Sequence, residues 1–246
     1  MFRAFSAKLL AGVTSRNKMA LLTSKDTNSD KEMAFDFHFP TSKKALIIFT
    51  RNPELGKVKT RLAKTVGDES ALNIYKFLLK HTVKITKNLH VDKYVFYSDE
   101  IHKNDIWDAD IFRKRVQSGE DLGEKMHNAF IEIFNMGYEM AIVIGSDMFE
   151  LNSEDLNGAF TVLQTNNFVI GPAQDGGYYL LGMKSPIEKV FQKKDWGTAT
   201  VLEQTLKDLE GEKFVLLEER NDIDYYEDIE GNKAFEQFLP AIIKKN

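Results

Sequence analysis

The chain has 246 residues, of which 43% are hydrophobic and 28% charged, so it has the composition of a globular protein whose length favours one large α/β domain. A formal net charge of −4 argues against a nucleic-acid binder that relies on basicity, and no stretch has the roughly 18 uncharged apolar residues that a membrane helix needs. Zero cysteines exclude disulfides, thiolate metal sites and cysteine nucleophiles, which favours a cytoplasmic location.

The first 40 residues differ in character from the rest. Residues 1–18 contain basic side chains and no acid, and residues 24–32 form a polar run. Two interpretations stay open: a disordered or mis-started extension, with Met19 or Met33 as the true start, or a targeting segment with a short apolar part. We expect the folded domain to span residues 41–246.

From Lys44 onward, patterns typical of strands and helices alternate. Buried-type apolar runs predict strands over residues 45–50, 91–97, 113–117, 140–144, 168–171, 178–183 and 214–217. Helical spacing predicts helices over 68–87, 120–134, 153–164, 198–209 and 225–238. The alternation predicts a single α/β, Rossmann-like domain with a mixed, mostly parallel sheet and helices on both faces. Ligands of such sheets bind beyond the carboxyl ends of the strands.

Several familiar catalytic motifs are absent from the sequence. There is no H-x-x-x-H pair, no G-x-S-x-G elbow, no Walker A loop and no G-x-G-x-x-G fingerprint. The chemistry left to the chain is that of carboxylates, backbone amides, Lys and Arg, which usually means a divalent metal and phosphates.

The segment after the first predicted strand is strongly basic. Residues 51–64 contain five cations against one acid, among them Arg51, Lys59 and Arg61. Pro53 and Gly56 favour a loop, and cations on a glycine-containing loop suit a polyphosphate. A plain solvated loop is the alternative.

Two further strand ends carry candidate ligand groups. Gly119 and Gly123 flank a predicted helix start, where backbone amides could meet a ligand, although a turn and helix cap would explain them equally well. Asp147 follows Gly145 and Ser146 at the end of the fourth strand, a suitable place to hold Mg²⁺ or Mn²⁺ on a diphosphate. A capping role is the competing account of Asp147.

The last candidates lie between residues 171 and 228. The string Gly171–Gly182 includes Asp175, Gly176, Gly177 and Tyr178, and is either a ligand loop or a hairpin turn. Trp196 precedes Thr198, for which a plain helix cap is the favoured interpretation. Residues 221–228 contain four acids, which predict either a charged helix start or a second metal ligand.

These strings together resemble a bacterial family of uncharacterised transferases with the nucleotide-diphospho-sugar transferase (GT-A) fold, often labelled arsenosugar-biosynthesis glycosyltransferases. The matching segments are 51–62 (R-x-P-x-x-G-x-x-K-T-R-L), 119–126, 145–151, 171–182 (G-P-A-x-D-G-G-Y-Y-L-[IL]-G), 196–198 and 222–228. One residue departs from the pattern: Phe149 replaces a usual proline, which we expect to alter the lip of that loop and the acceptor side.

The resemblance implies a metal-dependent glycosyltransferase that uses a nucleotide-diphospho-sugar, Mg²⁺ or Mn²⁺ and a small-molecule acceptor. It implies Asp147 and Asp224 as metal ligands, and Asp175, Lys59 and Arg61 as catalytic residues, with Asp175 a candidate general base. The expected nucleotide- and substrate-binding residues are Arg51, Gly56, Lys59, Arg61, Gly119, Asp121, Leu122, Gly123, Gly145, Ser146, Gly176, Gly177, Tyr178, Trp196 and Thr198.

Two rival functions stay open because one fold hosts many activities. The nearer rival is a nucleotidyltransferase that joins a nucleoside triphosphate to a small phosphorylated acceptor and releases pyrophosphate; the basic loop resembles that of phospholactate guanylyltransferases. The other is an inactive nucleotide-binding protein. The nucleobase, the sugar, the acceptor, the stereochemistry and the oligomeric state do not follow from the sequence.

Overall fold

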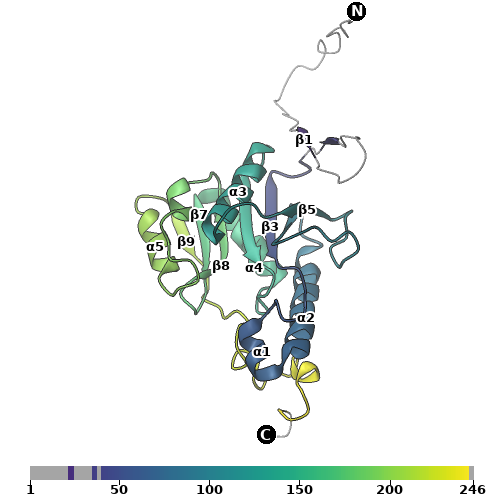
Figure 1. The fold of residues 1–246 in the computed structure, drawn as a ribbon. Helices are drawn as coiled ribbons and strands as arrows, with labels where there is room; N and C mark the ends of the chain where they lie inside the picture. Colours follow the sequence, from purple (N-terminus) through teal and green to yellow (C-terminus); the bar gives the residue numbers. More distant parts are fainter. Residues whose placement is uncertain (1–21, 25–34, 38–39, 244–246) are drawn as a thin grey trace, which may run out of the picture. The chain divides into compact units, whose positions relative to one another are not determined.

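A seven-stranded sheet forms the centre of residues 40–243 (Figure 1). Its strand order is β5 (Phe112–Val116), β4 (Asp92–Tyr97), β3 (Lys44–Thr50), β6 (Met140–Gly145), β8 (Tyr178–Met183), β7 (Phe168–Pro172) and β9 (Phe214–Leu216). Strand β8 runs antiparallel to β6 and β7, and the other neighbouring pairs are parallel. The mixed, mostly parallel sheet predicted from the sequence is therefore confirmed.

The computed structural model describes residues 22–24, 35–37 and 40–243. Strands β1 (Leu22–Ser24) and β2 (Phe35–Phe37) pair with each other in antiparallel register. From Pro40 onward the chain forms a compact unit of its own. The other residues on which the prediction for 1–40 depends lie outside the described ranges, so that prediction stays open.

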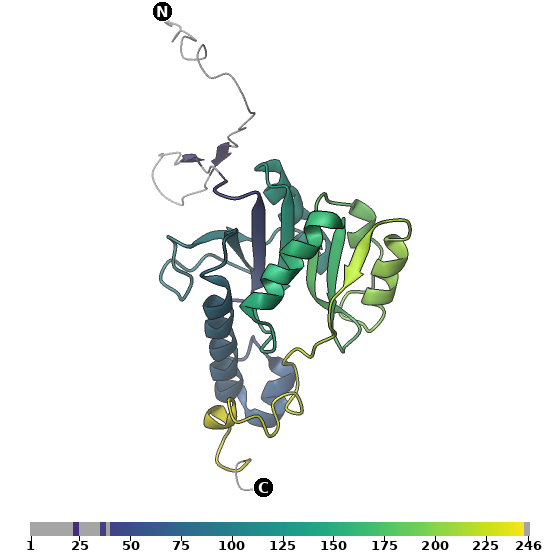
Figure 2. The same cartoon turned by 180° about the vertical axis from the view of Figure 1, so that it is seen from behind.

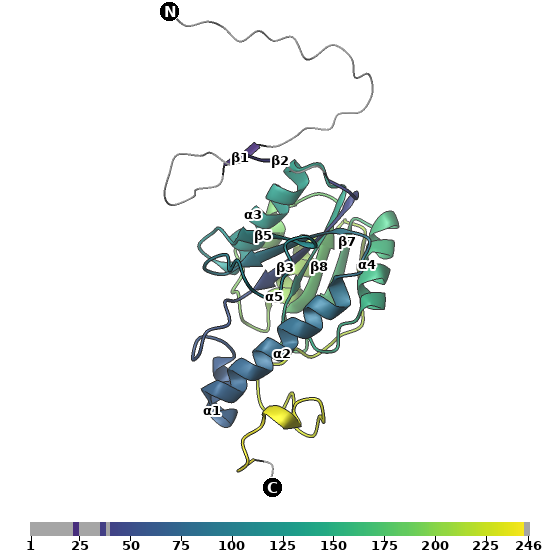
Figure 3. The same ribbon diagram turned by 90° about the vertical axis from the view of Figure 1, so that its right-hand side faces the viewer.

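Helices cover both faces of the sheet, as predicted. One apolar cluster joins α2 (Asp68–Thr86) and α4 (Ser153–Thr165) to one face, and a second joins α3 (Leu122–Asn135) and the 3₁₀ helix η1 (Glu188–Phe191) to the other. Successive side chains of a strand point to opposite faces, so Ile48 packs in the first cluster and Ile47 in the second. Figure 3 shows α3 and α4 on opposite sides of the sheet.

The direction of the strands decides where a ligand can bind. Because β8 alone is reversed within this sheet, its first residue lies at the edge where the six other strands end. The loop after β3, the loop after β6 and the hairpin between β7 and β8 therefore meet at one edge. The candidate residues of all three segments lie there.

A third apolar cluster lies beyond that edge. It joins α1 (Thr60–Val66) and α2 to the C-terminal segment that follows β9, through Leu62, Ile74, Ile223 and Phe235. Seen from behind (Figure 2), this yellow segment lies beside α1 and α2. The C-terminal segment is thus held on the body of the domain by side-chain packing.

Three element predictions need correction. The predicted closing helix over 225–238 is wrong: the segment consists of turns and one short 3₁₀ helix, η2 (Glu236–Phe238). The Asp228 carboxylate accepts hydrogen bonds from the backbone N–H groups of Asp224 and Tyr225, and Gly231 has a φ of 71°, so local contacts replace helical ones. The helix predicted from Thr198 is α5 (Val201–Asp208), which begins three residues later.

The third correction concerns the basic segment. It was predicted to be a loop throughout, but α1 begins at Thr60 and includes Arg61. No helix within the described ranges has both the length and the apolar character needed to cross a membrane.

Candidate functional site

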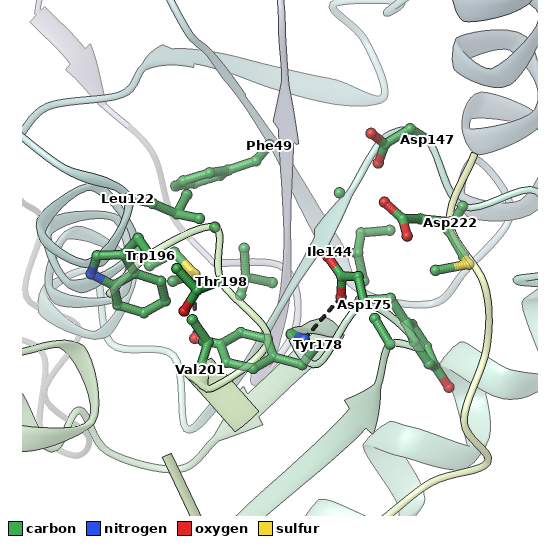
Figure 4. A pocket seen from close by; sticks show the side chains of 18 residues that line it. Phe49, Leu122, Ile144, Asp147, Asp175, Tyr178, Trp196, Thr198, Val201 and Asp222 are labelled. Carbon is green, nitrogen blue, oxygen red and sulfur yellow. Dashed lines mark hydrogen bonds between the residues drawn. The ribbon is translucent and has the colours of Figure 1, made fainter. Parts of the chain in front are cut away.

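A cavity of about 230 Å³ lies at the carboxyl edge of the sheet. Figure 4 shows two unlike sides: the carboxyl groups of Asp147, Asp175 and Asp222 gather on one, and Phe49, Leu122 and Trp196 lie on the other. The predicted site residues that line this cavity are Leu122, Gly145, Asp147, Asp175, Gly177, Tyr178, Trp196 and Thr198. The carboxyl-edge rule thus located the cavity from the sequence.

Lys59 joins the basic segment to the acidic side. Its side chain is 5% exposed, and its Nζ lies 2.8 Å from Asp147 Oδ2 and 3.2 Å from Asp224 Oδ1. Arg61 Nη1 lies 2.9 Å from Asp224 Oδ2. Lys59 adopts a φ of 47°, a left-handed conformation that costs a non-glycine residue about 1–2 kcal/mol. Such retained strain is often found at functional sites.

The charges of these groups shift one another's pKa values. Burial disfavours the ionised form of Asp147, but the Lys59 ammonium outweighs it and holds the pKa of Asp147 below its ordinary value. Burial also opposes protonation of Lys59, yet Asp147 and Asp224 keep the pKa of Lys59 above its ordinary value. Lys59 and Asp147 are therefore both charged at neutral pH.

Asp222 is a site residue that the sequence analysis did not single out. Burial, and then the negative charges of Asp147 and Asp224, raise the pKa of Asp222 to about 6. Ile223 is buried in the third apolar cluster. The chain bends at Ile223; Asp222 lines the cavity, whereas Asp224 pairs with Lys59 and Arg61. The order acid, apolar residue, acid is visible in the sequence, but it does not say which aspartate faces the cavity.

The β7–β8 hairpin brings Asp175 to the cavity. Asp175 Oδ1 accepts a hydrogen bond of 2.8 Å from the Gly177 N–H, which is the dashed line in Figure 4. Gly176 has a φ of 85°, and a Cβ at that position would lie 2.2 Å from the Ala199 carbonyl oxygen. The Gly176 carbonyl also accepts a hydrogen bond from Leu202 N–H. Glycine is thus required where the hairpin meets the 196–202 segment.

That segment supplies part of the cavity wall. A Cβ on Gly123 would lie only 2.6 Å from the Trp196 ring, so the packing of this ring requires glycine at position 123. Gly123 itself does not line the cavity. Thr198 lines the cavity and donates to the Asp195 carbonyl, whereas the N-cap of α5 is Thr200, so Thr198 is not the helix cap we favoured.

Tyr178 is part of the cavity wall and is not suited to act as a general acid. Burial raises the pKa of Tyr178, and its hydroxyl lies 3.9 Å from Met126 Sδ. Phe49, which also lines the cavity, was not predicted; its place at the end of β3 was the only signal.

Other predicted site residues lie outside the cavity lining. Asp121 is the N-cap of α3 and accepts a hydrogen bond from Glu124 N–H, and Gly119 makes the preceding turn with a φ of 133°. Ser146 is buried and shares hydrogen bonds with Tyr75 and Thr50. Gly56 has a φ of 74° in the basic segment. For these four residues the contacts are those of a turn, a cap or the core.

Arg51 has a different environment. It is exposed, and its charge contributes to the low pKa of Asp147. Glu54 pairs with Lys57 in the same segment. Of the three cations predicted to bind a ligand, Lys59 and Arg61 are paired with carboxylates, and Arg51 is exposed to a ligand near Asp147.

Phe149 does not lie where its departure from the family pattern suggested. Its ring packs against Phe77, Phe235 and His81, at centroid distances of 5.7, 4.9 and 5.1 Å, and it does not line the cavity. Phe149 joins the C-terminal segment to the domain, and its effect on the acceptor side stays a prediction.

The acidic side fits a metal that shares its ligands with phosphate. Among the described residues, no three His, Asp or Glu side chains come together in a way that could hold a metal on their own. Mg²⁺, however, is commonly held by one or two carboxylates together with phosphate oxygens and water. Asp147 and Asp222, whose charges repel each other, fit that role better than Asp224, because Lys59 and Arg61 engage both oxygens of Asp224.

The family model described as "Uncharacterized protein conserved in bacteria (DUF2064)" matches residues 81–198. A crystal structure from Desulfovibrio desulfuricans G20, described as a "putative nucleotide-diphospho-sugar transferase", is 30% identical, with a TM-score of 0.70 over 78% of this chain and 90% of that one. The 4-diphosphocytidyl-2C-methyl-D-erythritol synthase of Anaerococcus prevotii is 12% identical, with a TM-score of 0.50 over 79% of this chain and 96% of that one, and shows a shared fold alone. A search of curated proteins finds no match.

Proposed function

The chain belongs to the DUF2064 family of bacterial proteins, and from this premise we propose that it is a metal-dependent glycosyltransferase with a nucleotide-diphospho-sugar donor. The description of its 30% identical relative as a nucleotide-diphospho-sugar transferase supports the donor class. The Anaerococcus prevotii structure supports the shared fold and adds nothing on the donor.

One observation carries the proposal. Lys59, Asp147 and Asp224 converge from three distant parts of the chain at the mouth of a cavity that Asp175 and Asp222 also line. A cation pair beside a carboxylate pair is what a metal–diphosphate unit needs: the carboxylates hold the metal and the cations balance the phosphate charge.

Each residue then has a role in transfer. An acceptor oxygen bonds to the anomeric carbon of the sugar, the bond from that carbon to the diphosphate breaks, and the acceptor proton passes to the Asp175 carboxylate. Lys59 and Arg61 stabilise the negative charge that develops on the departing nucleoside diphosphate. A metal held by Asp147 and Asp222 would supply further positive charge to that leaving group.

Nucleotidyl transfer is the second candidate, and exposed Arg51 is the observation that favours it, since it offers a cation for a further phosphate. The other cations do not separate the two candidates, because Lys59 and Arg61 are engaged by carboxylates, and Lys57 by Glu54, whichever donor binds. An inactive protein is the third candidate; Phe149, its original support, lies outside the cavity lining.

Two assays separate the candidates. The purified protein with Mn²⁺ is incubated with UDP-, GDP-, dTDP- and ADP-sugars, and release of the nucleoside diphosphate is measured. In parallel, the four nucleoside triphosphates are tested for pyrophosphate release with sugar phosphates. We expect diphosphate release from at least one donor, abolished by EDTA, and no pyrophosphate. Pyrophosphate release alone would establish nucleotidyl transfer instead.

Matched variants connect either activity to the site. Asp147→Asn and Asp222→Asn should each lower turnover about 100-fold or more, as loss of a charge-stabilising group does. Glu210→Gln, a change of an exposed carboxylate that does not line the cavity, is the control and should leave turnover unchanged. Full activity of both aspartate variants would contradict the proposed site.

A further inference from the structure

The cavity has charge of one sign only. Of its eighteen lining residues, three are aspartates and none is Lys, Arg or His. Lys59 and Arg61 do not line it; their charged ends are bound to Asp147 and Asp224. Figure 4 shows the three carboxyl groups together on one side. Without a metal on the acidic side, a phosphate or carboxylate inside this space would meet like charge, since exposed Arg51 also lies outside the lining.

The rest of the lining is mostly apolar. Its largest side chains are Trp196, Tyr178, Tyr179 and Phe49, and Leu122, Met126 and Val201 also line it. Each neutral hydroxyl already donates within the protein: that of Tyr178 to Met126, that of Tyr179 to the Glu218 carbonyl and that of Thr198 to the Asp195 carbonyl. For the edge of a nucleobase, the lining offers carboxylate acceptors and the backbone groups of Gly145, Gly177 and Gly197, but few side-chain donors. An apolar or aromatic ring needs no such partners.

The size of the cavity suits a small body. An engineered apolar cavity of about 150 Å³ holds benzene. The space here is about 230 Å³, so it can take a ring with a short polar arm. The arm would reach the acidic side, where Asp175 accepts a proton in the proposed reaction.

We propose that this cavity holds the acceptor, and that the acceptor is a small neutral or cationic molecule with an apolar or aromatic body and a hydroxyl or amine as its nucleophile. The assignment of an acceptor here rests on the proposed function; its chemistry follows from the lining alone. A phosphorylated or carboxylated acceptor fits less well, because the lining has three aspartates and no cation.

The test uses three probes that share a 2-phenylethyl group and differ in the polar group: 2-phenylethanol, 2-phenylethylamine and 2-phenylethyl phosphate. The chain has two tryptophans, and Trp196 lines the cavity while Trp107 is buried in the first apolar cluster. Quenching of tryptophan fluorescence in EDTA therefore reports binding without metal, donor or turnover. Trp196→Phe should lose the signal, and Thr198→Phe, on an exposed loop that lines the cavity, should block binding by filling it.

We expect the amine and the alcohol to bind at least about tenfold more tightly than the phosphate, because the phosphate alone carries the same sign of charge as the three carboxylates. Asp175→Asn should reduce the ratio of the amine's affinity to the phosphate's affinity several-fold. Equal or tighter binding of the phosphate would overturn the proposal. The proposal would also be overturned if uridine, cytidine, adenosine or guanosine quenched the fluorescence of wild type but not of Thr198→Phe. Failure of all three probes to bind at millimolar concentration would overturn it as well.

Failure of this proposal and failure of the proposed function give different results. Donor use is measured separately, by diphosphate release in Mn²⁺. If no nucleotide-diphospho-sugar is used while the amine and alcohol still bind best, the donor class is wrong and the chemistry of the cavity stands. If donors are used and the phosphate probe binds best, the acceptor class is wrong.

Discussion

Ionisation of Asp222 in the folded protein lowers the free energy of unfolding. Its pKa is about 6 in the folded protein, against an ordinary value of 3.8, mainly because burial and the neighbouring Asp147 and Asp224 oppose its ionisation. Between those two pH values the unfolded chain loses its proton and the folded chain keeps it. Stability therefore falls as pH rises through this window, and the cost is fully present above pH about 6.

We predict that Asp222→Asn stabilises the metal-free protein at pH 8. Each pKa unit corresponds to about 1.4 kcal/mol, and allowance for solvent screening leaves a gain of about 1–2 kcal/mol. At pH 3.5 the gain should disappear, because the native carboxyl is then largely protonated in both states. Thermal unfolding in EDTA at the two pH values measures this. An equal or lower melting temperature for the variant at pH 8 would show that the carboxylates do not repel one another.

Lys59 is the complementary case. Replacing it with Met leaves Asp147 and Asp224 without their shared cation, and breaking a buried pair costs about 3–5 kcal/mol. Because those carboxylates are 36% and 34% exposed, we predict a loss of about 1–3 kcal/mol in urea unfolding at pH 7. Lys43→Met is the control: its pair with Glu139 is solvent-exposed, so its loss should be near zero. Equal losses for the two variants would count against a central role of Lys59.

At the scale of elements, the hairpin and the segment that follows Trp196 act as one wall. Gly176→Ala forces a Cβ against the Ala199 backbone and strains a positive φ, so we predict a loss of about 2–4 kcal/mol and a weakened affinity for whichever probe binds the cavity. Gly211→Ala is the matched control: its φ is 87°, a Cβ there meets nothing within 4 Å, and Gly211 does not line the cavity. It should cost only the backbone strain, about 1–2 kcal/mol.

Binding of the phenylethyl probes to both glycine variants, corrected for the folded fraction, measures the difference. If Gly176→Ala binds the probes as tightly as wild type and Gly211→Ala do, the packing of the hairpin against the loop does not shape the cavity.

The C-terminal segment is the other element that positions the site. Phe235 is fully buried and its ring contacts Phe149 and Phe77 in the cluster that also holds Ile223. We predict that Phe235→Leu lowers transferase turnover about tenfold, because it loosens the segment that carries Asp222 and Asp224. Phe160→Leu, an equally buried change in the first cluster, is the control for lost stability and should leave turnover within about twofold. Both variants are expected to cost about 1–1.5 kcal/mol; similar turnover in both would contradict a positioning role.

The sequence predicted the sheet well because its strands are short apolar runs buried on both faces, as at β3 and β6. The edge rule then brought Lys59 and Asp147 together although 88 residues separate them. The segment after β9 was predicted less well. Its apolar spacing matched a helix, but the Asp228 carboxylate binds backbone groups that a helix would use. The choice of Asp222 beside Asp224 depended on burial of Ile223 in the third cluster, a tertiary contact that local pattern does not contain.

At the scale of the whole domain, one reversed strand explains the arrangement of the site. With β8 antiparallel, the hairpin that carries Asp175 joins the edge where β3 and β6 end, and the segment after β9 closes the same edge with Asp222. Cations come from the β3 side and carboxylates from β6 and the C-terminal segment. Asp147 and Asp222 thus belong both to the acidic side that we propose binds the donor and to a cavity whose lining has no cation.

The most direct test of this account is isothermal titration calorimetry of UDP, GDP, CDP and ADP against wild type and Asp147→Asn, each with Mn²⁺ and with EDTA. The account predicts that at least one nucleoside diphosphate binds wild type only with Mn²⁺, and that Asp147→Asn weakens that binding by about tenfold or more, about 1.4 kcal/mol. Affinity that is the same in EDTA, or unchanged in Asp147→Asn, would contradict a metal–diphosphate site at the carboxyl edge of the sheet.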